Sequence, residues 1–400
     1  MTEKVNVIDS IMGGGKTSAM IDYINHSKGK ERFLYITPYL TEVNRIIENC
    51  AIKKFRQPET ITTKLKGLKN LLKHQRNIVS THAMFRLLDE ECLELIRENN
   101  YILILDEVAD VVESCNVTYD DILVLIKGGY AHLDNQHRLV WDYDKYDGVL
   151  YQDIKTQCES GCLSVYNNVP LWLFPVEVFQ SFQKVFILTY MFSSQIQKYY
   201  FDYNEIEYKY WGVEKIRDNT YHLCDYTDKD KVAYDYDSLV NICDNTKLNS
   251  IGDKNGSLSK NWYKNATDEE MNQLNKNCYN FIRNVAHAKS DEVLWTTFKG
   301  YKTKIANKGY AKSWIPVNSR ATNVYGDRNI VAYPVNRYMN PVIKNFFLQN
   351  GIQVDEEGYA LSEMVQFIWR SAIRSGKPID IYIPSKRMRE LFEKWLKKEK

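Results

Sequence analysis

Apolar and polar residues follow two different periods along the first half of the chain. Continuous apolar runs at residues 5–8, 32–37, 77–81, 101–105 and 185–188 predict buried strands. Segments 17–24, 40–50 and 83–99 carry apolar residues three or four positions apart, which predicts helices with one buried face. Because strands and helices alternate, we expect an α/β fold built on a parallel sheet.

The alternation restarts after residue 192. Further strands are expected at 203–213, 293–298, 330–333 and 379–383, and further helices at 271–285 and 385–398. Segment 117–175 is less regular and rich in Tyr and Asp, which indicates an insertion or outer helices of the first domain, and segment 241–268 is polar and loop-like. We therefore predict two α/β domains, residues 1–194 and 195–400, with an irregular insertion at about 117–175.

Composition supports two cores and no membrane span. The chain has 400 residues, of which 44% are hydrophobic, enough for two domains. No apolar run approaches the roughly 20 residues of a membrane helix, and no secretory signal precedes residue 10, so we expect a cytoplasmic protein without a membrane partner. The 8 cysteines are scattered. Only Cys158 and Cys162 lie close together, which favours buried reduced thiols over a zinc site.

The formal net charge is only +2, so a strongly positive surface can arise only where basic residues cluster. Lysine and arginine cluster at 64–76 and at 299–312, and tyrosines are interleaved in the second cluster. Such clusters suit either a solvated face or contacts with phosphates and bases.

A glycine-rich segment between the first strand and the first helix carries the clearest chemical signal. Its pattern is Ser10-x-x-Gly13-x-Gly15-Lys16-Thr17. Glycines let the backbone approach an anion, and the start of the following helix favours negative charge. Lys16 would reach the β- and γ-phosphates of a nucleotide and Thr17 would hold Mg²⁺. The predicted phosphate-binding residues are Ser10, Gly13, Gly14, Gly15, Lys16 and Thr17.

Two acids end the apolar strand at 101–105. Asp106 and Glu107 stand where open α/β sheets bind ligands, at the carboxyl end of a strand. Asp106 would hold Mg²⁺, and Glu107 would orient and deprotonate an attacking water.

A polar stripe near the C-terminus supplies cations. Gln366, Arg370 and Arg374 are spaced by four residues, which would place them on one face of a helix. A guanidinium from a second domain can neutralise the charge of a γ-phosphoryl group during transfer.

The order of these three motifs resembles the superfamily 2 helicases of the DEAD-like type. The resemblance implies two tandem RecA-like P-loop domains that clamp ATP and Mg²⁺ between them and step along nucleic acid. Asp106-Glu-Val-Ala109 is similar to the Asp-Glu box of that family, although it is neither Asp-Glu-Ala-Asp nor Asp-Glu-x-His. The strings at 189–192, 320–323, 336–341 and 369–374 are most similar to bacteriophage-encoded helicases.

The resemblance also implies residues that touch nucleic acid. They are Thr37, Pro38, Thr81, His82, Thr297, Lys299, Arg320, Thr322 and Asn323. The phage likeness favours single-stranded or forked DNA over RNA, with replication proteins as further partners and the host cytoplasm as location. Many members space the two arginines by three residues rather than four, so either Arg370 or Arg374 could be the arginine finger. Few residues precede Asp9, which leaves the preferred base of the nucleotide open.

The expected function is thus an ATP-dependent helicase or translocase, with Lys16, Glu107, Gln366, Arg370 and Arg374 in catalysis. Two alternatives stay open. One is another motor ATPase, such as a packaging motor, which would need an appended nuclease with clustered acids. The other is an ATP-binding scaffold or switch of a replication complex that does not hydrolyse its nucleotide.

Overall fold

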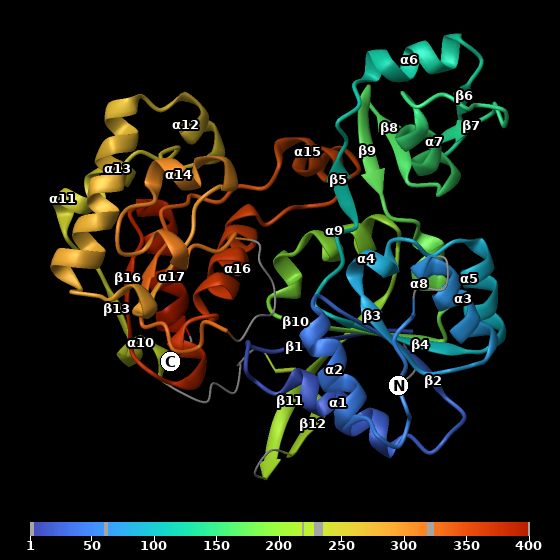
Figure 1. Cartoon of the computed structure of the whole chain (residues 1–400), viewed down its shortest axis with the longest axis horizontal. Helices are drawn as coiled ribbons and strands as arrows, with labels where there is room; N and C mark the ends of the chain where they lie inside the picture. The colour runs from blue at the N-terminus through green and yellow to red at the C-terminus, as the bar shows by residue number, and fades with distance from the viewer. Residues whose placement is uncertain (1–3, 60–62, 218–219, 228–234, 318–323, 399–400) are drawn as a thin grey trace.

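The computed structural model describes residues 4–59, 63–217, 220–227, 235–317 and 324–398. A seven-stranded sheet organises the first half, and a four-stranded sheet organises the second (Figure 1). The strands of the first sheet run in the order β12-β11-β1-β10-β4-β2-β3. Their bounds are β12 (Thr220–Asp225), β11 (Tyr208–Arg217), β1 (Val5–Asp9), β10 (Lys184–Thr189), β4 (Tyr101–Asp106), β2 (Arg32–Thr37) and β3 (Ile78–Thr81).

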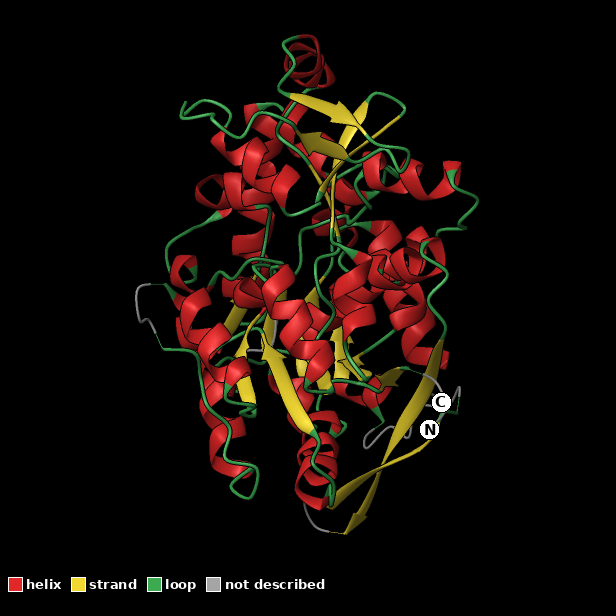
Figure 2. Ribbon diagram, turned by 90° about the vertical axis from the view of Figure 1, so that its right-hand side faces the viewer, coloured by secondary structure: helices red, strands yellow, loops and turns green. Residues whose placement is uncertain are grey.

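The centre of the first sheet is parallel and covered by helices on both faces (Figure 2). Every residue of β1 and β4 is buried, which explains their continuous apolar sequences. Parallel pairing brings the carboxyl ends of β1, β10 and β4 to the same edge, at Asp9, Thr189 and Asp106. The helices of this half are α1 (Lys16–His26), α2 (Leu40–Asn49), α3 (Lys64–Lys73), α4 (His82–Phe85), α5 (Glu90–Glu98), α8 (Val176–Ser181) and α9 (Ile196–Tyr203).

The segment between β4 and β10 forms a small lobe that projects from the first half (Figure 1). It is an insertion, as the sequence predicts, but it is more regular than expected. An antiparallel sheet in the order β5-β9-β8 and a hairpin of β6 and β7 organise it. Cys158 and Cys162 are buried there as free thiols. The lobe contains β5 (Val112–Ser114), α6 (Tyr119–Lys127), β6 (Ala131–Leu133), β7 (Leu139–Trp141), α7 (Gln152–Glu159), β8 (Leu163–Tyr166) and β9 (Val169–Leu173).

The second half surrounds a parallel sheet in the order β13-β16-β15-β14. Its strands are β13 (Val240–Ile242), β14 (Val293–Trp295), β15 (Ile330–Ala332) and β16 (Ile379–Tyr382). Its helices are α10 (Tyr236–Leu239), α11 (Thr246–Asn249), α12 (Lys260–Asn265), α13 (Asp268–Asn280), α14 (Lys302–Ile305), α15 (Pro341–Gln349), α16 (Glu356–Ile368) and α17 (Lys386–Lys398). The expected α/β fold with two mostly parallel sheets and an insertion is confirmed.

The boundary expected at residue 195 does not match the packing. Helix α9 packs into the core of the first half, and β11 and β12 complete the edge of its sheet. The chain therefore passes to the second sheet between β12 and β13. Helix α15 packs back onto β5 and α9, where Phe346 and Phe347 join the first core, so the two halves share apolar packing.

Three local predictions are wrong for identifiable reasons. The helix expected at 83–99 is split into α4 and α5, because the Asp89 side chain caps a new helix by accepting from the Cys92 amide. The polar segment 241–268 holds β13, α11 and α12, whose starts at Asn245 and Ser259 are also capped by side chains. The strand expected from residue 203 begins only at Tyr208, after α9 ends.

Among the described residues, no helix combines the length and apolar character needed to cross a bilayer.

Candidate active site

The glycine-rich segment forms a tight loop between β1 and α1. Gly13 and Gly15 adopt φ of 86° and 91°, a left-handed conformation that residues with a Cβ rarely tolerate. Ser10 anchors the loop start, since its amide donates to the Thr189 carbonyl over 3.1 Å. Gly14 donates to the Ile11 carbonyl over 3.0 Å and does not line the cavity that Gly13 and Gly15 border. The loop thus has the shape expected of a phosphate cradle at a helix start.

Lys16 is buried inside this loop. Its ammonium donates to the carbonyl oxygens of Ser10 and of Ile11, the latter over 3.1 Å. Burial lowers the pKa of Lys16, while the charges of Glu107, Asp9 and Asp106 oppose that effect. A polyanion would offer the ammonium stronger partners than the two carbonyls it now contacts.

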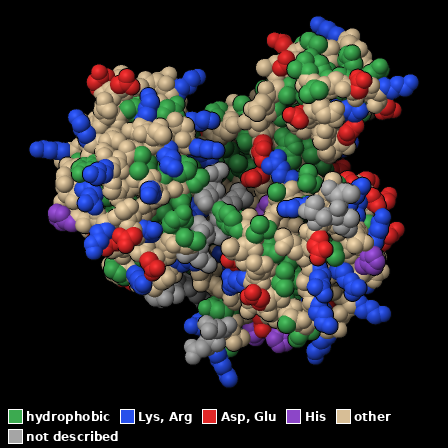
Figure 3. All heavy atoms as spheres, in the orientation of Figure 1, with side chains coloured by type: hydrophobic (Ala, Val, Ile, Leu, Met, Phe, Trp, Pro, Cys, Tyr) green, Lys and Arg blue, Asp and Glu red, His purple; other side chains and the backbone are tan. Residues whose placement is uncertain are grey.

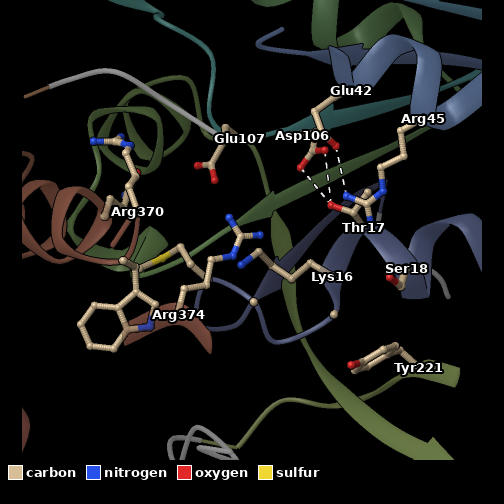
Figure 4. A pocket seen from close by; sticks show the side chains of 15 residues that line it. Lys16, Thr17, Ser18, Glu42, Arg45, Asp106, Glu107, Tyr221, Arg370 and Arg374 are labelled. Carbon is tan, nitrogen blue, oxygen red and sulfur yellow. Dashed lines mark hydrogen bonds and ion pairs between the residues drawn. The ribbon is translucent and has the colours of Figure 1, made fainter. Parts of the chain in front are cut away.

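Asp106 lies next to Thr17 at the end of β4 (Figure 4). The Thr17 hydroxyl lies 3.4 and 3.5 Å from the two carboxylate oxygens, and the Tyr35 hydroxyl donates to one of them over 3.2 Å. Burial and the neighbouring charges of Glu107 and Glu42 raise the pKa of Asp106 to about 7. The carboxylate is therefore held in a place where its charge is costly unless a cation joins it.

Glu107 occupies a strained position. Its φ is 83°, which is rare for a residue with a side chain and costs about 1–3 kcal/mol. The amide of Glu107 donates to the Leu188 carbonyl over 2.9 Å, so β10 holds the strained turn. Among the described residues, no group hydrogen-bonds the buried carboxylate oxygen Oε2 of Glu107. Strain and a buried acceptor both mark this acid as a candidate for chemistry rather than for packing.

Gln366, Arg370 and Arg374 reach the same cavity, but not from one helix as expected. Helix α16 ends at Ile368, and a separate 3₁₀ turn spans Ala372–Ser375. The helix ends here because the Ala372 amide donates its hydrogen bond to the Arg328 carbonyl over 2.8 Å, and not to a carbonyl of α16.

The two arginines take different directions. Arg374 ends beside Lys16, whereas Arg370 is directed away from it (Figure 4). The Arg374 side chain also packs over the glycine-rich loop, with its Cγ 3.3 Å from the place a Cβ on Gly13 would occupy. Burial lowers the pKa of Arg374, and its charge in turn lowers the pKa of Lys16. Two cations from opposite halves therefore converge on one point.

One cavity of about 170 Å³ collects these groups. Its walls come from the phosphate loop, the ends of β4 and α16, and several residues that the sequence did not indicate. The unexpected residues are Met12, Ser18, Glu42, Arg45, Tyr221 and Trp369. Glu42 and Arg45 lie on α2 and form an ion pair at 3.1 Å. Met12 inside the motif, Ser18 next to it and Trp369 in the string 369–374 had sequence signals that could have pointed to them. Glu42, Arg45 and Tyr221 had none.

The residues expected to touch nucleic acid are dispersed. Thr37 and Thr81 face each other at the ends of β2 and β3, Pro38 follows the first of them, and His82 contacts the Asp106 carbonyl through Nε2 at 3.3 Å. Thr297 and Lys299 instead line a second, larger cavity. The expected contacts Arg320, Thr322 and Asn323 lie outside the described residues.

The donor set fits a divalent cation with a preference for oxygen. Thr17 and Asp106 bring a hydroxyl and a carboxylate together, and the raised pKa of Asp106 would fall if a cation were beside it. The buried Glu107 oxygen adds a third hard acceptor nearby. Thr17 and Asp106 are the residues that would hold Mg²⁺.

Comparison with known proteins assigns the chain to a family. Residues 234–396 match the model of the YonV C-terminal Rossmann-like domain. Over 415 aligned residues that span both chains completely, the sequence is 40% identical to the SPbeta prophage-derived uncharacterized protein YonV of Bacillus subtilis (strain 168). Among solved structures, Xpd4 of S. tokodaii aligns over 98% of this chain and 94% of its own, with a TM-score of 0.47 and 12% identity.

Proposed function

We propose that this chain, which belongs to the YonV family, is an ATP-dependent motor that moves along nucleic acid. One observation carries the proposal. Lys16, Asp106 and Glu107 of the first half and Arg374 of the second half line one cavity. An enzyme that assembles its site from two halves can couple nucleotide turnover to their relative movement.

The positions of these groups support hydrolysis of the nucleotide. The loop amides and Lys16 hold the β- and γ-phosphates, and Mg²⁺ held by Thr17 and Asp106 would neutralise phosphate charge. Glu107 orients the attacking water and takes its proton, for which its buried oxygen is available. Arg374 stabilises the charge that develops on the γ-phosphoryl group, and its direction in Figure 4 favours it over Arg370 as the finger.

A cavity of about 1450 Å³ between the halves supplies the track for nucleic acid. Figure 3 shows the notch between the second half and the inserted lobe, with Lys and Arg side chains beside it. Gln366 lines both this cavity and the nucleotide cavity, and the segment 108–112 leads from Glu107 directly into its wall. These two elements are the physical connection through which turnover could change the grip on the polymer.

The chemistry of the larger cavity suits a phosphodiester chain with exposed bases. Three exposed lysines line it and form no ion pair among the described residues, while two other cations are neutralised as Lys344–Glu356 and Arg337–Glu363 pairs. Half-buried aromatic rings stand among the cations and can stack on bases. The lysines are Lys260, Lys264 and Lys299, and the rings are Phe298, Tyr301 and Tyr338.

The relative's prophage origin supports DNA as the polymer, and phage replication or recombination as the setting. A non-hydrolysing scaffold is disfavoured by the strained Glu107 and the converging Arg374. Neither feature would be needed in a protein that only binds nucleotide.

The test is strand displacement together with stimulated hydrolysis. A fluorescent duplex with a 3′ tail, a 5′ tail or no tail is mixed with ATP and Mg²⁺, and release of the strand is followed. The Lys264→Ala/Lys299→Ala variant should need several-fold more polymer for half-maximal stimulation and should show a shallower salt dependence. Lys276→Ala, an exposed lysine of α13 that does not line the cavity, is the matched control. Hydrolysis that no polymer stimulates would contradict the proposed track.

A further inference from the structure

The hairpin of β11 and β12 places an aromatic ring on the phosphate loop. Its two strands pair in antiparallel register at the edge of the first sheet, and β12 lies against α1. Leu223 and its cross-strand partner Val213 pack against the apolar cluster that contains Met20 of α1. Tyr221 lies two residues from Leu223, on the same face of the strand, and reaches the start of α1 at Gly15.

The contact with Gly15 is close. A Cβ on Gly15 would lie 2.1 Å from Cδ1, 2.4 Å from Cε1 and 2.6 Å from Cγ of Tyr221. Gly15 is thus required for two reasons, its φ of 91° and the ring above it. The phosphate loop is held between Arg374 over Gly13 and Tyr221 over Gly15.

The polarity of the cavity shows which end of a nucleotide Tyr221 would meet. Asp106, Glu107 and Arg374 gather at the end where the γ-phosphate must lie. Tyr221 and Ser18 lie together on the other side of Lys16 (Figure 4). A triphosphate whose γ end faces the acids must therefore direct its nucleoside toward Tyr221.

We propose that Tyr221 is the base-binding wall of the site and stacks on the nucleobase of the bound triphosphate. This inference rests on the nucleotide binding proposed above and adds the residue that holds the nucleoside. Pockets that enclose small molecules and cofactors measure roughly 300–1,000 Å³, whereas this cavity measures about 170 Å³. This cavity therefore suits the phosphates, and the base takes the open space beside the Tyr221 ring.

A stacking wall sets a loose base preference. Every base presents a π-face, so stacking alone does not distinguish adenine from guanine. The neighbouring Ser18 hydroxyl both donates and accepts hydrogen bonds, and therefore suits either purine. We expect the site to accept ATP and GTP with similar affinity.

The experiment compares ligands that contain or lack a base. Dissociation constants for ATP, GTP and inorganic tripolyphosphate are measured with Mg²⁺ by competition against a fluorescent ATP. Tyr221→Ala should weaken ATP and GTP binding by about 5-fold to about 150-fold, the range that aromatic stacking on a base represents. Tripolyphosphate affinity should stay within about 2-fold, and Tyr221→Phe should restore ATP binding because it keeps the ring. His222→Ala, which removes the neighbouring contact with Asp22 at 3.5 Å, controls for damage to the hairpin.

Each outcome decides the inference. Unchanged ATP affinity in Tyr221→Ala overturns it. Equal loss of ATP and tripolyphosphate also overturns it, because the ring would then shape the loop rather than hold the base. Wild-type protein that binds none of the three ligands refutes the proposed function itself, which separates that failure from a failure of the stacking role.

Discussion

Replacing Asp106 by Asn should stabilise the fold while removing the carboxylate that we propose holds Mg²⁺. Burial and nearby acids raise the pKa of this carboxyl to about 7, from an ordinary value of 3.8. The folded protein therefore holds the proton more tightly than the unfolded chain, and its stability falls as the pH rises from about 4 through about 7. The resulting cost is on the order of 4 kcal/mol at about pH 8.5 and about 2 kcal/mol at about pH 5. Asn has nearly the same shape, and its amide oxygen can still accept from the Tyr35 hydroxyl.

Urea unfolding of wild type and Asp106→Asn at the two pH values measures this cost. The variant should be the more stable protein, and its advantage should be larger at pH 8.5 than at pH 5. Mg²⁺ with ATP should stabilise wild type and should not stabilise the variant to the same degree. Asp153→Asn, which removes an exposed carboxylate from α7, controls for the loss of one charge. An advantage that does not change with pH would show that the Asp106 carboxyl does not have the raised pKa described above.

Three further substitutions separate the roles within the cavity. Glu107→Gln should lower steady-state ATP hydrolysis by at least about 10²-fold and leave ATP affinity near that of wild type, because it removes only the proton acceptor. Arg374→Ala should lower kcat by about 10³-fold or more, whereas Arg370→Ala, directed away from Lys16, should cost much less; equal losses would refute the assignment of the finger. Gly15→Ala should abolish ATP binding, because its Cβ would lie 2.1 Å from the Tyr221 ring. The control Gly351→Ala also has a positive φ, 78°, but its Cβ would meet open space, so this variant should bind ATP normally. Equal ATP affinities of the two variants in a fluorescence titration would contradict the role of the overlap.

Much of the first half could be predicted from sequence because its chemistry is local. The strands β1, β2, β4 and β10 are continuous apolar runs, and the phosphate loop and Asp106-Glu107 follow two of them directly. A motif attached to the end of a buried parallel strand comes to the sheet edge with its neighbours, wherever they lie in the chain. The sequence alone therefore allowed the prediction that Lys16 and Asp106 lie close together.

The rest of the site depends on packing between distant segments. Tyr221 belongs to a hairpin whose half-buried residues have no clear apolar period. Nothing in the sequence around Tyr221 links it to Gly15, which lies 206 positions earlier in the chain. The spacing of Arg370 and Arg374 predicts one helix, because it cannot reveal that the Ala372 amide donates to the Arg328 carbonyl and that the helix ends before it. The boundary was misplaced at 195 for the same reason: α9 and the edge strand β11 resemble the start of a new domain until their sheet partners are known.

The most direct test of the central claim is the rate of ATP hydrolysis by purified wild-type protein and its Lys16→Ala variant, with and without single-stranded DNA. We predict turnover by wild type, stimulation by the polymer, and loss of both in the variant, whose folding is checked by circular dichroism. A variant that hydrolyses ATP as fast as wild type would show that the cavity formed by Lys16, Glu107 and Arg374 is not where the chemistry occurs.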